Sequence, residues 1–283
     1  MTSIERMLTI GGPPPLAGIL SEPAPGDPAR ETLILLNSGM MHHVGTCNLS
    51  VKIARRTASL GTLAYRFDFS GIGDSRSRSF AGSHEEREVS EVREVMDELT
   101  RRTGAERFLL CGLCSGADAA MATAVVDDRV AGIAQIDPYC FRTGRWYLRH
   151  YLARVREREA WSRLFRKLRG GPVAVDGLPR EYLEEIDEQE RHDFDKGGLT
   201  SGYRSLVERG VRTLVIMTEG QSFCYNYEGQ FRDVFARVPF GTLLDEHYLP
   251  STRHTIIEPD DQAFVTDLIS DWAVAGHAVA DQG

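Results

Sequence analysis

The segment from Leu109 to Ala120, LLCGLCSGADAA, constrains the fold of this chain more than any other stretch. It begins as the end of an apolar run, which is typical of a buried strand, and it leads into small apolar residues with helical character (117–126). Between the two, the glycines of Gly112-Leu113-Cys114-Ser115-Gly116 predict a sharp turn with close backbone packing. Cys114 is therefore expected at a helix N-terminus, where unpaired N–H groups and the helix dipole favour a thiolate.

Short apolar strands and helices alternate along most of the chain. The sequence predicts strands at 4–10, 16–20, 32–36, 62–67, 107–111, 130–136, 213–218 and 242–248, and helices at 48–60, 84–103, 117–126, 227–237 and 260–275. Such alternation indicates an α/β fold with a mostly parallel central sheet, right-handed crossovers and helices on both faces. The active site of such a fold is expected beyond the carboxyl ends of the strands.

Residues 139–205 interrupt this alternation. Between residues 142 and 169 there are ten Lys or Arg and two Glu, whereas between 176 and 195 there are nine acidic residues and two Arg. We predict a helical lid or cap, inserted into an α/β core formed by residues 1–138 and 206–283. Its basic half could attract an anionic substrate, such as an acyl thioester on a phosphopantetheine carrier. The alternative is that the two halves pair in surface salt bridges, which stabilise little.

Composition and charge exclude several classes of function. The net charge of −8 argues against nucleic acid as a partner, and no run of about 18 apolar residues predicts a membrane span. The first residues, MTSIERMLTIGG, show no secretory signal, and the five cysteines lack the spacing of a disulfide framework. We therefore expect reduced cysteines and a cytoplasmic protein. Neither a metal-ligand spacing nor a nucleotide-binding loop is present, so no metal and no cofactor are expected.

Four segments in order along the chain resemble the α/β-hydrolase superfamily, and the resemblance covers roughly residues 4–276. LILLNSGMM resembles its oxyanion loop, YRFDFSGIGDS its D-x-x-G-x-G-x-S segment, GLCSGADAA its nucleophile elbow and STRHTI its C-terminal histidine loop. The chain is also similar to the hydrolases that accompany exosortase A systems. These share a sequence close to RFDxxGMGDS, a GLC-type elbow and an Arg/Tyr-rich lid start such as RWYLRHYLAR. The elbow departs from the superfamily by having Cys where Ser is usual.

Cys114 and His254 are the predicted nucleophile and base. The thiol occupies the position that the elbow exposes, and His254 lies between the last strand and the last helix, as the resemblance implies. Ser115 is a rival nucleophile, but it comes one residue late, so its side chain is expected to point away from the site. The spacing of Cys111 and Cys114 also matches a C-x-x-C redox motif, although Cys111 is expected to point into the core.

The remaining site residues are predicted less directly. The main-chain N–H groups of Ser115 and of Gly39 or Met40 are expected to form the oxyanion hole. One histidine of the pair at 42–43 lies beside that loop and could touch substrate. The segment after the strand at 213–218 lacks the usual Asp, so Glu219, Asp137 and Asp245 all remain candidates for the acid, as does the absence of an acid.

Three functions follow from these residues. The first is a hydrolase that acts on a carboxylic ester or thioester through a Cys–His(–acid) acyl-enzyme mechanism. The second is an acyltransferase that passes the acyl group to an amine or alcohol, and the third is a non-catalytic binding protein of the same fold. The expected partner is a small-molecule acyl substrate, with a carrier-bound thioester as one form. The oligomeric state is open, with a homodimer as one alternative.

Overall fold

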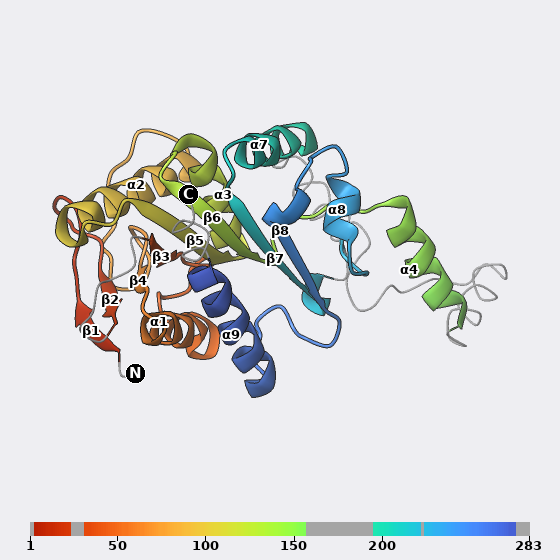
Figure 1. The fold of residues 1–283 in the computed structure, drawn as a ribbon, viewed down its shortest axis with the longest axis horizontal. Coiled ribbons are helices and arrows are strands. Elements are labelled where there is room, and N and C mark those ends of the chain that lie inside the picture. Colours follow the sequence, from red (N-terminus) through yellow and green to blue (C-terminus); the bar gives the residue numbers. More distant parts are fainter. Residues whose placement is uncertain (1–2, 24–30, 157–194, 222–223, 276–283) are drawn as a thin grey trace, which may run out of the picture.

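The computed structural model describes residues 3–23, 31–156, 195–221 and 224–275. Within these residues, eight strands form one sheet in the order β1-β2-β4-β3-β5-β6-β7-β8 (Figure 1). Every pair from β4 to β8 is parallel, whereas β1 and β2 join the edge in antiparallel fashion. The strands are β1 (Ile4–Met7), β2 (Gly18–Glu22), β3 (Glu31–Leu35), β4 (Leu63–Phe67), β5 (Arg107–Leu113), β6 (Val130–Ile136), β7 (Arg212–Thr218) and β8 (Leu244–Leu249). The predicted mostly parallel sheet is confirmed.

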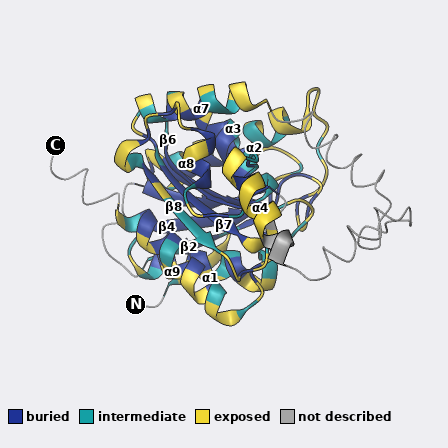
Figure 2. Ribbon diagram, turned by 90° about the vertical axis from the view of Figure 1, so that its right-hand side faces the viewer, coloured by how far each residue is buried: buried dark blue, intermediate teal, exposed yellow. Residues whose placement is uncertain are grey.

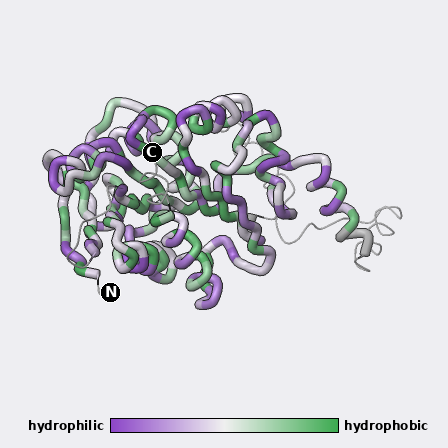
Figure 3. The backbone as a smooth tube through the Cα atoms, viewed as in Figure 1, coloured by the Kyte–Doolittle hydropathy of each residue, from purple (hydrophilic) through white to green (hydrophobic). Residues whose placement is uncertain are grey.

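Helices cover both faces of the sheet. One face carries α1 (Leu49–Ser59) and α9 (Pro259–Ala275), and the other carries α2 (His84–Thr103), α3 (Ser115–Val126) and α7 (Lys196–Glu208) (Figure 1). Figure 2 shows the strands as a buried layer between helices with exposed outer sides, and Figure 3 shows hydrophobic residues concentrated along the central strands. The two faces hold separate apolar clusters, since alternate residues of each strand point to opposite sides.

The sequence signals at the ends of α2 explain its bounds. Ser83 and Glu86 form a capping box at its start, and Gly104 takes a left-handed conformation at its end, with φ of 75°. Between these caps, one face of the helix packs on the sheet through Val92, Val95, Met96 and Leu99. The predicted helix at 84–103 is confirmed.

Three predicted elements are shorter in the structure. The strand predicted at 4–10 ends at Met7, and the helix predicted at 227–237 is reduced to α8 (Gln230–Val234), which begins late since Gly229 has φ of 84° and cannot continue a helix. The strand predicted at 242–248 begins only at β8, because the 3-10 turn η3 (Gly241–Leu243) precedes it. Two further 3-10 turns are η1 (Thr46–Asn48) and η2 (Glu219–Gln221).

The predicted insertion at 139–205 is described only at its two ends. Its start contains α4 (Gly144–Arg156), which extends away from the sheet, whereas its last residues begin α7, which continues past residue 205 to Glu208 and packs with α3 over the sheet (Figure 1). Trp146 anchors the first turn of α4, because its side chain is buried and its carbonyl accepts a hydrogen bond from Asn226. Residues 157–194, which hold most of the predicted acidic half, lie outside the described residues. Among the helices described, none is long and apolar enough to cross a bilayer.

Candidate active site

The candidate residues gather at one edge of the sheet. In a parallel sheet the carboxyl ends of neighbouring strands meet, and the segments that follow them become neighbours in space. The loop at 37–43 follows β3, Cys114 follows β5, Asp137 follows β6, and the turn with His254 comes after β8. The described hydrogen bonds connect these segments across sequence separations of up to 117 residues.

Cys114 lies in a strained turn between β5 and α3. Its φ of 53° and ψ of −121° are unusual for a residue with a side chain, and persist only where the surroundings impose them. A Cβ at Gly112 would overlap the backbone of Gly116, and a Cβ at Gly116 would overlap the carbonyl of Asn37. The glycines are therefore required for the close approach of strand, helix and loop, and the thiol stands at the start of α3 as predicted.

His254 lies between Cys114 and a carboxylate. Its Nδ1 is 2.7 Å from Oδ2 of Asp137, and hydrogen bonding to Asp137 and then to Cys114 raises the pKa of His254 to about 10. The side chain is only about one-third exposed, with a fractional exposure of 32%. The imidazole is consequently charged at neutral pH, as expected for a base that rests beside a thiol and a carboxylate.

Asp137 is held rigidly at the end of β6. Its carboxylate is buried and accepts hydrogen bonds from the main-chain N–H of Thr218 at 2.6 Å and from the Thr218 hydroxyl at 2.7 Å. Its backbone has φ of 47°, a second strained residue at this edge. Thr218, the last residue of β7, thus orients the carboxylate toward His254. Sequence reasoning missed Thr218, since a threonine at a strand end carries no distinguishing signal.

The other two candidate acids lie elsewhere. The side chain of Glu219 is exposed, and the described hydrogen bonds of His254 do not include it. Asp245 is exposed on β8, where it pairs with His247 at 2.9 Å. The backbone beside Glu219 nevertheless lies against His254. A Cβ placed on the next residue, Gly220, would overlap the backbone and the Cβ of His254. Of the three candidates, the structure brings Asp137 to the histidine.

The loop predicted to form the oxyanion hole is tied to the elbow. The main-chain N–H of Gly39, which has φ of 51°, donates a hydrogen bond to Oγ of Ser115 at 2.7 Å. The side chain of Ser115 therefore faces the loop, whereas the sequence predicted that it would point away. The side chain of Met40, the other residue of this loop predicted to supply an N–H donor, is 82% exposed. The loop is held by Asn37, whose side chain bonds the Phe69 N–H at 2.7 Å and the Met41 carbonyl at 2.6 Å.

Comparisons with known proteins bear on the fold. No protein-family model matches the sequence, and no curated protein resembles it significantly. An alpha-beta serine hydrolase homologue from Coxiella burnetii has a TM-score of 0.57 and 15% identity, over 94% of this chain and 96% of that one. The esterase domain of a Rhodothermus marinus protein has a TM-score of 0.55 and 16% identity, over 95% and 98%. An esterase from Pyrococcus furiosus has a TM-score of 0.58 and 12% identity, over 96% and 92%.

The chain has the α/β-hydrolase fold. The likeness spans nearly the whole chain, so the fold predicted from four short segments is confirmed. In an α/β-hydrolase fold the turn after the central strand carries the nucleophile, and here that turn follows β5 and carries Cys114. The closer likeness to hydrolases of exosortase A systems stays a prediction.

A cluster of two histidines and two aspartates supports the loop at 37–43, which is predicted to form the oxyanion hole. Nδ1 of His43 is 2.7 Å from Oδ2 of Asp68, and Nε2 of His42 is 3.1 Å from Oδ2 of Asp74. Burial alone would raise the pKa of Asp68, but hydrogen bonds from His43, Asp74 and Asn37 hold it below its usual value. The four ligand atoms lie within 4.8 Å of one another, so this cluster could hold a metal ion. Their mutual hydrogen bonds, however, already give it a role in joining the loop to the turn after β4.

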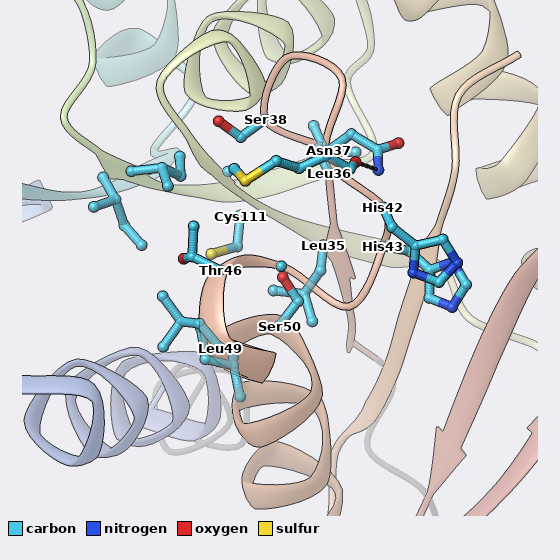
Figure 4. Close-up of a pocket in the computed structure, with 16 residues that line it drawn as sticks. Leu35, Leu36, Asn37, Ser38, His42, His43, Thr46, Leu49, Ser50 and Cys111 are labelled. Carbon is cyan, nitrogen blue, oxygen red and sulfur yellow. Dashed lines mark hydrogen bonds between the residues drawn. The ribbon is translucent and has the colours of Figure 1, made fainter. Parts of the chain in front are cut away.

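A small cavity lies behind the loop at 37–43. Its volume is about 30 Å³, and its walls come from that loop, α1 and the end of β5 (Figure 4). Cys111 faces this cavity, and burial raises the pKa of its thiol to about 12. Cys111 and Cys114 are both free thiols. Because a neutral buried thiol is a poor nucleophile, the geometry disfavours the redox C-x-x-C alternative.

We expect the pKa of His254 to be near 10 in the folded protein, and to fall toward 6.5 in Asp137→Asn, because Asp137 is the largest cause of the shift. NMR titration of the imidazole would measure both values. Since the folded pKa exceeds the unfolded one, this charge stabilises the fold fully below about pH 6.5, and the stabilisation is lost as the pH rises toward 10. An unchanged imidazole pKa in Asp137→Asn would contradict the assignment of Asp137 as its partner.

Proposed function

We propose that this protein hydrolyses a carboxylic ester or thioester through an acyl-enzyme formed on Cys114. The observation that carries this proposal is the position of His254, whose Nδ1 lies 2.7 Å from the buried carboxylate of Asp137 and whose pKa is raised by both Asp137 and Cys114. Acyl transfer requires a nucleophile, a base and an orienting acid that contact one another in this order. In this proposal Asp137 takes the role of the acid, in place of Glu219.

In the first half of the reaction, the thiolate of Cys114 attacks the carbonyl carbon of the substrate. A sulfur–carbon bond forms, and the carbonyl electrons move onto oxygen. The main-chain N–H of Ser115 and a donor from the loop at Gly39 and Met40 hold this oxyanion. The intermediate then collapses, and the leaving group departs with a proton from the imidazolium of His254.

In the second half, water hydrolyses the thioester. His254 is now neutral, because it has given its proton to the leaving group, and it can take a proton from the attacking water. Asp137 keeps the ring in one orientation through both halves, and Thr218 keeps Asp137 in place. The charged form of His254 is restored when Cys114 is released.

An activated ester is the direct test. After brief mixing with a p-nitrophenyl ester of a short acid, we expect the intact mass of the protein to rise by one acyl group, and peptide mapping to place that group on Cys114. Labelling elsewhere, or no labelling of a folded protein, would contradict the proposal. The second outcome would favour a binding protein of the same fold.

Acyl transfer to an amine or alcohol is the second candidate, favoured by the cysteine itself. A thioester intermediate reacts readily with amines relative to water, whereas an ester on serine does so less. Adding graded concentrations of an amine during turnover separates the two reactions. A product ratio that stays constant supports the hydrolase, and a ratio that shifts toward the amide supports the transferase.

A carrier-bound thioester is one substrate form that we propose. The described start of the predicted insertion carries Arg145 and Arg149 on α4. Burial and the Glu219 carboxylate raise the pKa of the Tyr248 hydroxyl and Arg149 opposes that shift, so a negative and a positive charge both act near the end of β8. An anionic phosphopantetheine arm would be attracted to positive charges of this kind.

The division into a core and an inserted lid stays a prediction, and so does a homodimeric state.

A further inference from the structure

One hydrogen bond at the elbow changes the composition of the oxyanion hole. The N–H of Gly39 donates to Oγ of Ser115 at 2.7 Å. A main-chain N–H carries one proton, so this bond commits the donor that an oxyanion would otherwise receive from Gly39. The hydroxyl of Ser115 accepts this bond and keeps its own proton, which no hydrogen bond among the described residues engages.

The position of this hydroxyl is fixed by packing on both sides. Ser115 is the first residue of α3, directly after Cys114, and is half-buried. A Cβ at the next residue, Gly116, would overlap the carbonyl of Asn37, so the helix start and the loop are in direct contact. The loop itself is held by the side chain of Asn37. A donor in such a preorganised position stabilises developing charge without a reorganisation cost.

We propose that the Ser115 hydroxyl, polarised by the N–H of Gly39, is a catalytic donor of the oxyanion hole, together with the main-chain N–H of Ser115. This inference rests on the proposed function, since an oxyanion forms only if Cys114 attacks a carbonyl. As the sulfur–carbon bond forms and the carbonyl electrons move to oxygen, the hydroxyl donates a hydrogen bond to that oxygen and retains its proton. The proton for the leaving group comes from His254.

The alternative is that the hydroxyl of Ser115 merely occupies the place of the oxyanion. Substrate would then displace it and receive the hydrogen bond from Gly39 directly. The two arrangements predict opposite effects of removing the hydroxyl. If it donates, Ser115→Ala loses a donor, whereas if it only occupies the hole, Ser115→Ala frees the Gly39 N–H and activity stays the same or rises.

Steady-state kinetics with an activated ester provides the test. We expect Ser115→Ala to lower kcat by roughly 10²–10³-fold with little change in KM, which is typical of losing one oxyanion donor. Ser115→Thr keeps a hydroxyl at the same position and should recover most of that loss. Ser90→Ala, at an exposed serine of α2, is the matched control and should behave as wild type. Activity of Ser115→Ala at or above wild type would overturn the inference.

A second measurement separates this role from damage to the elbow. Alkylation of Cys114 by iodoacetamide displaces iodide and develops no oxyanion, so its rate should be equal in wild type and Ser115→Ala. Equal losses of alkylation and ester turnover would overturn the inference, because the thiolate itself would then be impaired. Wild type that forms no acyl-enzyme would overturn the proposed function as well, whereas acylation that is rapid in both proteins would overturn this inference alone.

Discussion

Replacement of Cys114 by alanine should abolish turnover of an activated ester. In the proposed mechanism the thiol bonds to the acyl carbon, and no other described cysteine can replace it, since Cys111, Cys140 and Cys224 are buried and Cys47 does not contact His254. The expected residual rate is that of the uncatalysed reaction plus whatever the oxyanion hole and binding supply, so a loss of roughly 10³-fold or more is expected. Hydrolysis of p-nitrophenyl esters measures it directly.

The matched control for this variant is Cys47→Ser. Cys47 is the exposed free thiol of the chain and lies outside the contacts of His254. Its replacement should leave ester turnover unchanged, which excludes a general effect of removing a reactive thiol. Full activity in Cys114→Ala, with the folded state verified by circular dichroism, would refute the acyl-enzyme on Cys114 and return attention to the neighbouring hydroxyl of Ser115.

Replacement of Asp137 by asparagine should reduce kcat by roughly 10³-fold while leaving the fold intact. An amide of the same size cannot stabilise the imidazolium and presents its NH₂ to the ring, so His254 loses both its charge partner and its orientation. Asparagine fills the same space beside Thr218 as aspartate does. We therefore expect the main effect to be a lower kcat and not a lower free energy of unfolding. Kinetics across pH 6 to 10 would also show the changed pKa of His254.

Glu219→Gln is the comparison that decides between the candidate acids. Glu219 follows β7, where the superfamily usually supplies its acid, yet its side chain is exposed and His254 bonds Asp137. We expect Glu219→Gln to change kcat less than threefold. The reverse pattern, with Asp137→Asn active and Glu219→Gln inactive, would show that a different arrangement of the loop operates during turnover.

The resting state of the site follows from the charge on His254. With a pKa raised to about 10, the imidazole carries a proton before substrate binds and can give it to the leaving group. In the proposed mechanism it becomes a base only after that transfer, at the stage when water must be activated.

Local patterns predicted the elements that depend on local chemistry. The glycines around Cys114, the helical spacing of apolar residues at 84–103 and the apolar runs of the central strands each act within a few residues, so the sheet, the helices and the elbow could be predicted. Glycines with positive φ delayed the starts of α8 and β8 relative to the predicted ranges, because hydrophobic spacing alone does not indicate where the backbone must turn.

The sequence by itself predicted the nucleophile, since a thiol flanked by close-packed glycines between a strand and a helix has few other structural explanations. The tertiary structure alone showed which candidate acid contacts His254 and which way the Ser115 hydroxyl points. Asp137 and His254 are 117 residues apart, and Gly39 and Ser115 are 76 apart. Such pairs meet only because parallel strands bring their carboxyl ends to one edge, and the exact partner depends on how β6, β7 and the loop after β8 pack there.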